Sequence, residues 1–245
     1  MPKKYDELRE DALYNLRAYM DSLDEKKRTI LAYWVRDYVR FLKKEDSFDP
    51  KKLVRYKRGS IVKAHLGFRV GSEEGGLHYA VVLDNANALS SPTVTVIPLT
   101  SWKSTSKQHP SRVLLGSEIY TLVKDKILST IDEAEQLQQS IQQHIEGSKD
   151  STAIDQSVLE VEQRLLGSEI EKLTQKVVLA RRMLRDIAKM KSGSIALVGQ
   201  ITTISKIRIY DPMYPLDTLS GIRLSAESMD KLDATLKTLY TKVDK

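Results

Sequence analysis

Hydrophobic residues recur at helical spacing through the first fifty positions of the chain. They are Leu8, Ala12, Leu16, Tyr19, Ile30, Leu31, Trp34, Val35, Tyr38, Phe41 and Leu42. Such steps place the side chains on one face of a helix. Ser22 and Glu25 have the spacing of a capping box, in which a hydroxyl and a carboxylate bind backbone N–H groups at a helix start. We predict helices that pack on the rest of the protein, pack on a second copy, or cover a functional groove.

Between residues 58 and 101 the spacing changes to that of β-strands. Short apolar runs occupy residues 61–66, 79–83 and 93–97, and the third alternates hydroxyl and aliphatic side chains. The glycine-rich segment 71–76 separates the first two runs, and such a segment favours a turn over a helix or a strand. Residues 111–115 resemble a further strand. The pattern predicts a small antiparallel sheet or barrel whose polar loops hold the candidate chemistry.

Helical spacing returns from residue 118 onward and is regular in a second segment. The second segment places Leu166, Ile170, Leu173, Val177, Ala180, Leu184 and Ile187 at alternating steps of four and three. This is a heptad seam, which needs a partner to bury it. With the break at residues 147–152, it predicts an antiparallel hairpin with arms of roughly 40–50 Å. The arms pair with each other, or they form a partner-binding or dimer-extending surface.

The C-terminal part returns to strand spacing and then to a helix. Residues 194–209 are predicted as strand, 211–215 as a turn, and Ser225 as the N-cap of a final helix. The chain is therefore α+β. We divide it into an N-terminal helical extension (1–52), a core (53–116 and 192–245) and an inserted helical hairpin (117–191).

Composition narrows the function only moderately. The chain has 39 Lys and Arg against 33 Asp and Glu, a net charge of +6, which gives a mild preference for polyanions. Residues 51–58 are densely cationic and form either a solvated linker or a phosphate-binding track with Tyr56 stacking on a base. Cysteine is absent, and the scattered histidines show no metal-ligand spacing. We expect a cytoplasmic protein with no membrane segment, no metal and no cofactor.

Four stretches resemble a known family. They are the glycine-rich segment Gly71–Gly76 followed by a strand from His78, the PLTS sequence ending at Ser101, the segment Ile195–Arg208, and the segment Leu224–Lys237. In this order they resemble the MazF/PemK toxins of type II toxin–antitoxin systems. The resemblance implies an SH3-like antiparallel β-barrel, shared with the Kid and CcdB toxins, and a metal-independent endoribonuclease. It also implies an RNA substrate, a cognate antitoxin and a homodimer formed through the barrel.

The resemblance also points to catalytic residues. The family credits an Arg after the Gly-Gly turn and a Thr at the end of the third strand, and these positions hold His78 and Thr100 here. Histidine moves protons near neutral pH, whereas Arg supplies a permanent charge. Glu73 is expected to orient the imidazole. The expected RNA-binding residues are Ser72, Gly75, Gly76, Ser101, Lys103, Gln200, Lys206 and Arg208.

Two other functions remain open at this point. One is a non-catalytic module of the MazF/CcdB fold that binds protein or nucleic acid and has lost activity through His78. The other is a self-restrained sensor whose N-terminal helices cover the site.

Overall fold

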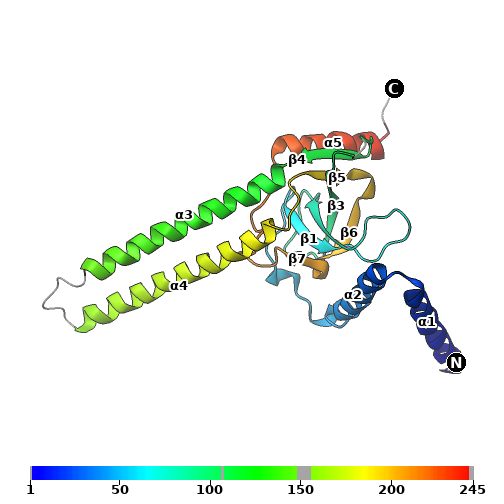
Figure 1. Cartoon of the computed structure of the whole chain (residues 1–245), viewed down its shortest axis with the longest axis horizontal. Coiled ribbons are helices and arrows are strands. Elements are labelled where there is room, and N and C mark those ends of the chain that lie inside the picture. Colours follow the sequence, from blue (N-terminus) through cyan, green and yellow to red (C-terminus); the bar gives the residue numbers. More distant parts are fainter. Residues whose placement is uncertain (1, 106–107, 148–155, 243–245) are drawn as a thin grey trace.

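An antiparallel sheet with helices around it forms the body of the protein (Figure 1). The structure, a computed structural model, describes residues 2–105, 108–147 and 156–242. Most of the predicted break at 147–152 lies outside the described residues. The strands are β1 (Ile61–His65), β2 (Leu77–Val82), β3 (Thr93–Ser101), β4 (Arg112–Gly116), β5 (Ser194–Leu197), β6 (Thr202–Ser205) and β7 (Ile209–Asp211).

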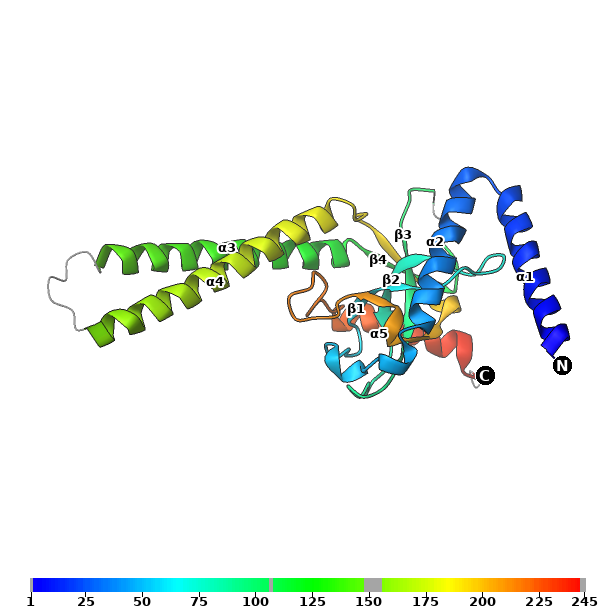
Figure 2. The same ribbon diagram turned by 90° about the horizontal axis from the view of Figure 1, so that it is seen from below.

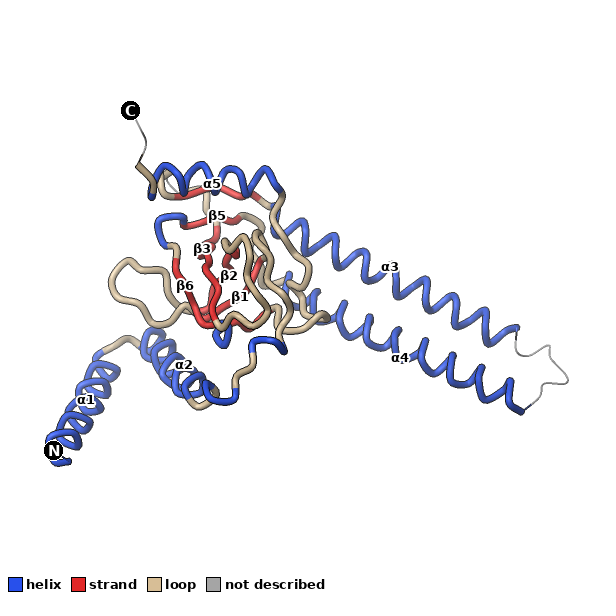
Figure 3. Tube along the Cα trace, turned by 180° about the vertical axis from the view of Figure 1, so that it is seen from behind, coloured by secondary structure: helices blue, strands red, loops and turns tan. Residues whose placement is uncertain are grey.

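The helices surround this sheet on different sides. They are α1 (Pro2–Ser22), α2 (Glu25–Leu42), α3 (Glu118–Gly147), α4 (Gln156–Ile187) and α5 (Ala226–Tyr240). Helices α3 and α4 project together from the sheet, α5 lies along β4, and α2 lies on the opposite side (Figures 1 and 3). The mixed class predicted from the spacing is confirmed. The strand character predicted over 194–209 is confirmed, and short 3-10 turns at Val198–Gln200 and Lys206–Arg208 divide the segment into β5, β6 and β7.

The sheet follows an open path, so the predicted closed barrel is not observed. The strand order is β4-β5-β3-β2-β1-β7, and β6 also pairs with β3. Strand β3 accommodates two partners on one edge because β6 pairs with its first half and β5 with its last three residues. Near the β4 end, Ile119 of α3 and Leu232 of α5 join the core, which helical side chains thus complete.

The N-terminal helices differ in how they contact the sheet. Helix α2 packs through Trp34, whose ring stacks on His65 with the ring centres 4.5 Å apart. Buried Asp37 accepts a hydrogen bond from the Tyr210 hydroxyl at 2.9 Å. Packing of this helix on the sheet is therefore confirmed. The predicted capping box is wrong: Ser22 ends α1, and Asp24 caps α2 by accepting from the Lys27 N–H.

The hairpin pairs with itself and is rooted in the core. Ile119, Val123 and Ile127 of α3, with Leu179 and Met183 of α4, belong to the same buried cluster as the sheet residues. Intramolecular pairing is thus confirmed (Figure 2). The predicted seam is only partly correct, because Ile170 and Leu184 are about half exposed at 47% and 48%. Met183 is fully buried and takes the inward position next to Leu184.

Two further findings concern Tyr56 and the expectation that the chain has no membrane segment. Tyr56 does not stack on a base, because it is buried and its hydroxyl donates a hydrogen bond to the Pro212 carbonyl at 2.8 Å. Its ring instead belongs to the core cluster on one face of the sheet. In the described part of the chain, no helix combines the length and the apolar character that a membrane crossing requires.

Candidate active site

Strands β2 and β3 bring His78 and Thr100 together. Their register pairs Val82 with Val96, Val81 with Ile97 and Ala80 with Pro98. Because antiparallel partners share a face, extending this register by two residues places His78 opposite Thr100. The Nδ1 atom of His78 lies 3.1 Å from the carbonyl oxygen of Leu99, whose peptide group leads into Thr100. The two residues credited by the resemblance therefore lie on adjacent strands and the same face.

The carboxylate beside the imidazole belongs to Glu74. Its Oε1 lies 3.1 Å from Nε2 of His78, and both side chains are about three-quarters buried. The expectation for Glu73 is therefore corrected: its carboxylate is largely exposed and lies 3.9 Å from an Arg69 nitrogen. Both ring nitrogens of His78 face oxygen atoms that accept hydrogen bonds, and only the doubly protonated imidazolium donates from both nitrogens.

Glycines shape the loop between β1 and β2 that holds Glu74. Gly67 and Gly76 have φ values of +101° and +85°, which side chains rarely adopt. A Cβ on Gly75 would lie 2.8 Å from the Gly67 carbonyl oxygen, so only glycine permits this close approach. The Gly76 N–H donates to that same carbonyl at 2.7 Å. It is therefore already used within the loop, which corrects its expected contact with RNA.

Gln200 ties this loop to the far end of the sequence. Its Oε1 accepts a hydrogen bond from the Glu74 N–H, and its Nε2 donates to the Ser72 carbonyl at 3.2 Å. The side chain expected to contact RNA thus has a different observed role: it holds the backbone on both sides of Glu73. Because Glu74 contacts His78, Gln200 positions the catalytic candidates indirectly.

A cavity of about 450 Å³ opens beside this loop. It is lined by Arg69, Ser72, Glu73, Glu74, Pro98, Gly199, Gln200, Ile201 and Thr202. The guanidinium of Arg69 donates to the Leu66 carbonyl at 2.9 Å and to Thr202 Oγ1 at 3.3 Å. Arg69 therefore brings a cation beside Thr202 from another loop. No local pattern predicts this contact, because the two residues are far apart along the chain.

The remaining expected cations lie in different surroundings. Lys206 is buried, and its Nζ donates to the Ala88 carbonyl at 3.0 Å, so its expected RNA contact is wrong. The Arg208 guanidinium lies 5.7 Å from the Trp34 ring centre, beside α2. Burial, with Arg69 nearby, lowers the pKa of Arg208. Ser101 and Lys103 are exposed at and just beyond the end of β3.

The surroundings of the site also bear on two broader expectations. Within residues 2–105, 108–147 and 156–242, no three His, Cys, Asp or Glu side chains group in a way that could hold a metal ion. Among the described residues that line the cavity, none comes from α1 or α2. The hypothesis that these helices cover the groove therefore gains no support from the cavity.

Part of the chain matches a known protein family. Residues 57–165 match the model of a family described as PemK-like, MazF-like toxins of type II toxin–antitoxin systems. This segment contains the β1–β2 loop, His78, Thr100 and the first arm of the hairpin. A comparison with curated proteins finds no match. Over residues 57–165, the chain is thus similar to the PemK-like, MazF-like toxins of type II toxin–antitoxin systems.

Proposed function

We propose that the protein is a metal-independent endoribonuclease toxin that cleaves single-stranded RNA. The observation that supports this most directly is the contact of His78 with both Glu74 and the peptide group preceding Thr100. An acid–base pair and a hydroxyl are thereby gathered beside a cavity that contains a guanidinium group. Cleavage of RNA without a metal needs these kinds of groups.

In the proposed reaction, the 2′-hydroxyl attacks the adjacent phosphorus as the bond from phosphorus to the 5′-oxygen breaks. The products are a 2′,3′-cyclic phosphate and a 5′-hydroxyl. Glu74 accepts the proton of the 2′-hydroxyl, and the His78 imidazolium donates a proton to the leaving 5′-oxygen. Bound RNA would replace one of the two protein contacts of His78, so that its N–H faces the substrate.

Arg69 and Thr100 are proposed to stabilise the negative charge on the phosphoryl oxygens. The Arg69 guanidinium is about two-thirds buried, which strengthens its interaction with an anion relative to an exposed cation. It also offers the planar set of donors that suits phosphate. Ser72 lines the same cavity and supplies a hydroxyl near its mouth. Gly75 and Gln200 maintain the loop shape on which this arrangement depends.

A second function is favoured by one specific observation. Both nitrogens of His78 already contact protein oxygens, so the unliganded site has no uncommitted imidazole nitrogen. A protein that binds RNA or another macromolecule without cutting it would fit this arrangement. The two functions differ in whether RNA binding breaks one of the His78 contacts.

The family supports further parts of the proposal. The match to a type II toxin family suggests an antitoxin partner, and we infer that its acidic segment would occupy the cavity beside Arg69. We further propose that the protein is a cytoplasmic homodimer and that its open sheet is a variant of the SH3-like fold. The hairpin at 117–191 is proposed to be inserted into this core.

The deciding experiment compares wild type, His78→Ala, Thr100→Ala and Glu74→Ala for growth inhibition and for cleavage by purified protein with a chelator present. We expect wild type to cut RNA and leave 5′-hydroxyl ends. Loss of an acid–base group lowers the rate by about 10²- to 10⁴-fold. Equal growth inhibition by all variants with intact RNA would overturn the nuclease and support the binding module.

A further inference from the structure

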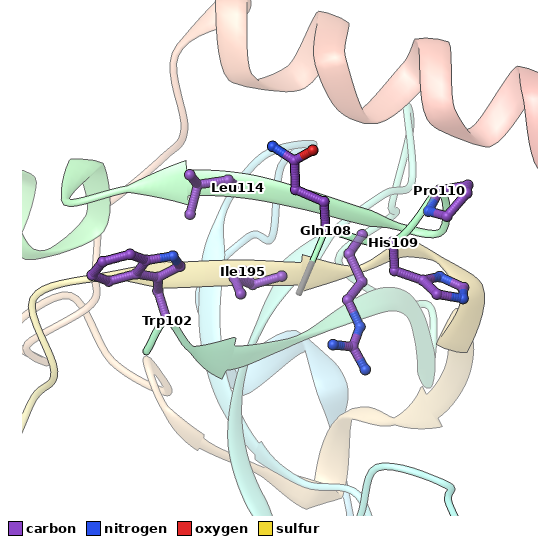
Figure 4. A pocket seen from close by; sticks show the side chains of 7 residues that line it. Trp102, Gln108, His109, Pro110, Leu114 and Ile195 are labelled. Atoms are coloured by element: carbon purple, nitrogen blue, oxygen red, sulfur yellow. The ribbon is translucent and has the colours of Figure 1, made fainter. Parts of the chain in front are cut away.

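A second cavity lies on the face of the sheet that holds Thr100. It has a volume of about 450 Å³ and is lined by Trp102, Gln108, His109, Pro110, Arg112, Leu114 and Ile195. Figure 4 shows Leu114 and Ile195 on neighbouring strands, with Trp102 on one side and Gln108, His109 and Pro110 on the other. The Trp102 and Leu114 side chains are large, apolar and about half exposed, at 48% and 56%.

Strand pairing places this cavity on the same face of the sheet as Thr100. Thr100 of β3 pairs with Ile195 of β5, and Ile195 pairs with Leu114 of β4. Residues paired in this way share one face of the sheet. Two strand spacings, roughly 10 Å, therefore separate Thr100 from Leu114. A chain bound at Thr100 needs little length to reach the second cavity.

The position of Trp102 is set by close packing. The backbone N–H of Trp102 donates a hydrogen bond to the Gly193 carbonyl at 2.9 Å. A Cβ on Gly193 would lie 3.0 Å from the Trp102 Cβ and 3.4 Å from the ring, so the tryptophan rests directly on the glycine. The indole is thus held in place while remaining half exposed, as a stacking platform requires.

Polar groups with defined roles border the apolar floor. The Nδ1 atom of His109 accepts a hydrogen bond from the Ser111 N–H at 3.2 Å, so the neutral ring has its proton on Nε2. Gln108 adds an amide that both donates and accepts, and Arg112 adds a permanent cation. An aromatic platform, mixed hydrogen-bonding groups and a cation match a nucleotide: a flat base, polar base edges and a phosphate.

We propose that this second cavity binds a nucleobase adjacent to the scissile phosphate of RNA. The base stacks on Trp102, its edge contacts Gln108 or His109, and Arg112 contacts the flanking phosphate. The inference rests on the proposed endoribonuclease function and adds a residue set that selects the RNA. A second copy of the chain is the competing occupant. The cation and the edge-reading groups favour RNA, because an interface between copies needs no permanent positive charge at this place.

The test measures binding separately from cleavage. The chain has two tryptophans, so Trp34→Phe leaves Trp102 as the only indole. In this background, an oligoribonucleotide with a 2′-deoxy sugar at the cleavage position is titrated while the Trp102 fluorescence is followed. We expect quenching on binding. For the variants without an indole, binding is measured by the fluorescence anisotropy of a dye-labelled copy of the same oligonucleotide. We expect Trp102→Ala to weaken binding about 5- to 150-fold, the range expected for one stacked base, and Trp102→Phe to retain most of the affinity.

Two companion variants separate this site from the catalytic one. Thr100→Ala should abolish cleavage while the fluorescence quenching persists. Gly193→Ala should displace the indole and weaken binding, although it replaces none of the side chains proposed to contact RNA. Circular dichroism and thermal melting confirm that each variant is folded.

The outcomes distinguish this inference from the function on which it rests. Cleavage and binding unchanged in Trp102→Ala would overturn the base site and leave the nuclease standing. Quenching and Trp102-dependent binding without any cleavage would support the base site and overturn the nuclease. Loss of self-association in Trp102→Ala at unchanged RNA affinity, measured by sedimentation, would assign the cavity to a second copy and overturn the inference.

Discussion

The Glu74 carboxylate lies 3.1 Å from Nε2 of His78, four residues further along the chain, whereas the neighbouring Glu73 points to Arg69. We expect Glu74→Ala to lower RNA cleavage by about 10²- to 10⁴-fold, because the site loses its proposed general base and the His78 ring loses a contact that orients it. Glu73→Ala is the matched control and should retain most activity. Single-turnover rates at saturating protein measure both, and equal rates in the two variants would contradict the assigned contact.

Arg69 should account for one phosphate contact. We expect Arg69→Ala to weaken RNA binding and to reduce the slope of log affinity against log salt by about 0.7, the value for one neutralised phosphate of a single strand. Arg36→Ala is the control, because its side chain is 65% exposed on α2, away from the cavity. Binding isotherms at several salt concentrations check this. An unchanged slope in Arg69→Ala would exclude the contact.

Lys206 should affect stability and not RNA binding. Its pKa is lowered by burial, and Nζ binds the Ala88 carbonyl and lies 5.7 Å from the centre of the Tyr56 ring. Lys206→Met leaves that carbonyl without its partner, so we expect a loss of about 1–3 kcal/mol in the free energy of unfolding. Urea denaturation measures it. By contrast, changing the exposed Lys103 to Met should weaken RNA binding.

Asp211 should make stability depend on pH. Burial raises its pKa from 3.8 to about 6, while the hydrogen bond from the Leu219 N–H and the nearby Arg182 oppose the shift. An acid with a raised pKa in the folded state adds stability at low pH, and this contribution is lost as the pH rises through about 6. Asp211→Asn keeps an oxygen acceptor and removes the charge.

The pH prediction is measured as a difference between the two proteins. From about pH 4 to about pH 7, the free energy of unfolding of Asp211→Asn should rise relative to wild type by up to about 3 kcal/mol. Chemical denaturation at several pH values provides both curves. A difference that does not change with pH would mean that the pKa of the Asp211 carboxyl is the same in the folded and unfolded states, which would contradict the prediction.

The repeating pattern of the sequence predicted those parts of the fold that depend on local spacing. The helices, the first strands and the N-cap at Ser225 follow from periodicity and hydroxyl placement, and Ser225 does accept from the Ser228 N–H. The open form of the sheet could not be predicted from this pattern, because closure into a barrel depends on which strand edges pair with each other. The turns that divide residues 194–209 were not predicted, because short turns between apolar positions leave the spacing almost unchanged.

The site was predictable only where contacts are local. His78 and Thr100 were found because each lies in a recognisable motif. Glu74 was missed in favour of Glu73, since two adjacent carboxylates differ only in the direction that the loop gives them. Arg69, which meets Thr202, and Trp102, which rests on Gly193, were missed for a different reason. The two residues of each pair are far apart along the chain, so no local sequence pattern predicts their contact.

The hairpin emerges between β4 and β5, which are direct neighbours paired at Gly116 and Ser194. A short turn would connect two such strands, so the sheet itself does not require the arms. The first turns of α3 and the last turns of α4 nevertheless fill the shared core, through Val123 and Met183 among others. The outer part of the hairpin can therefore differ in length without disturbing this core. Removal of the inner turns would instead expose the buried cluster beneath β2 and β3 to solvent.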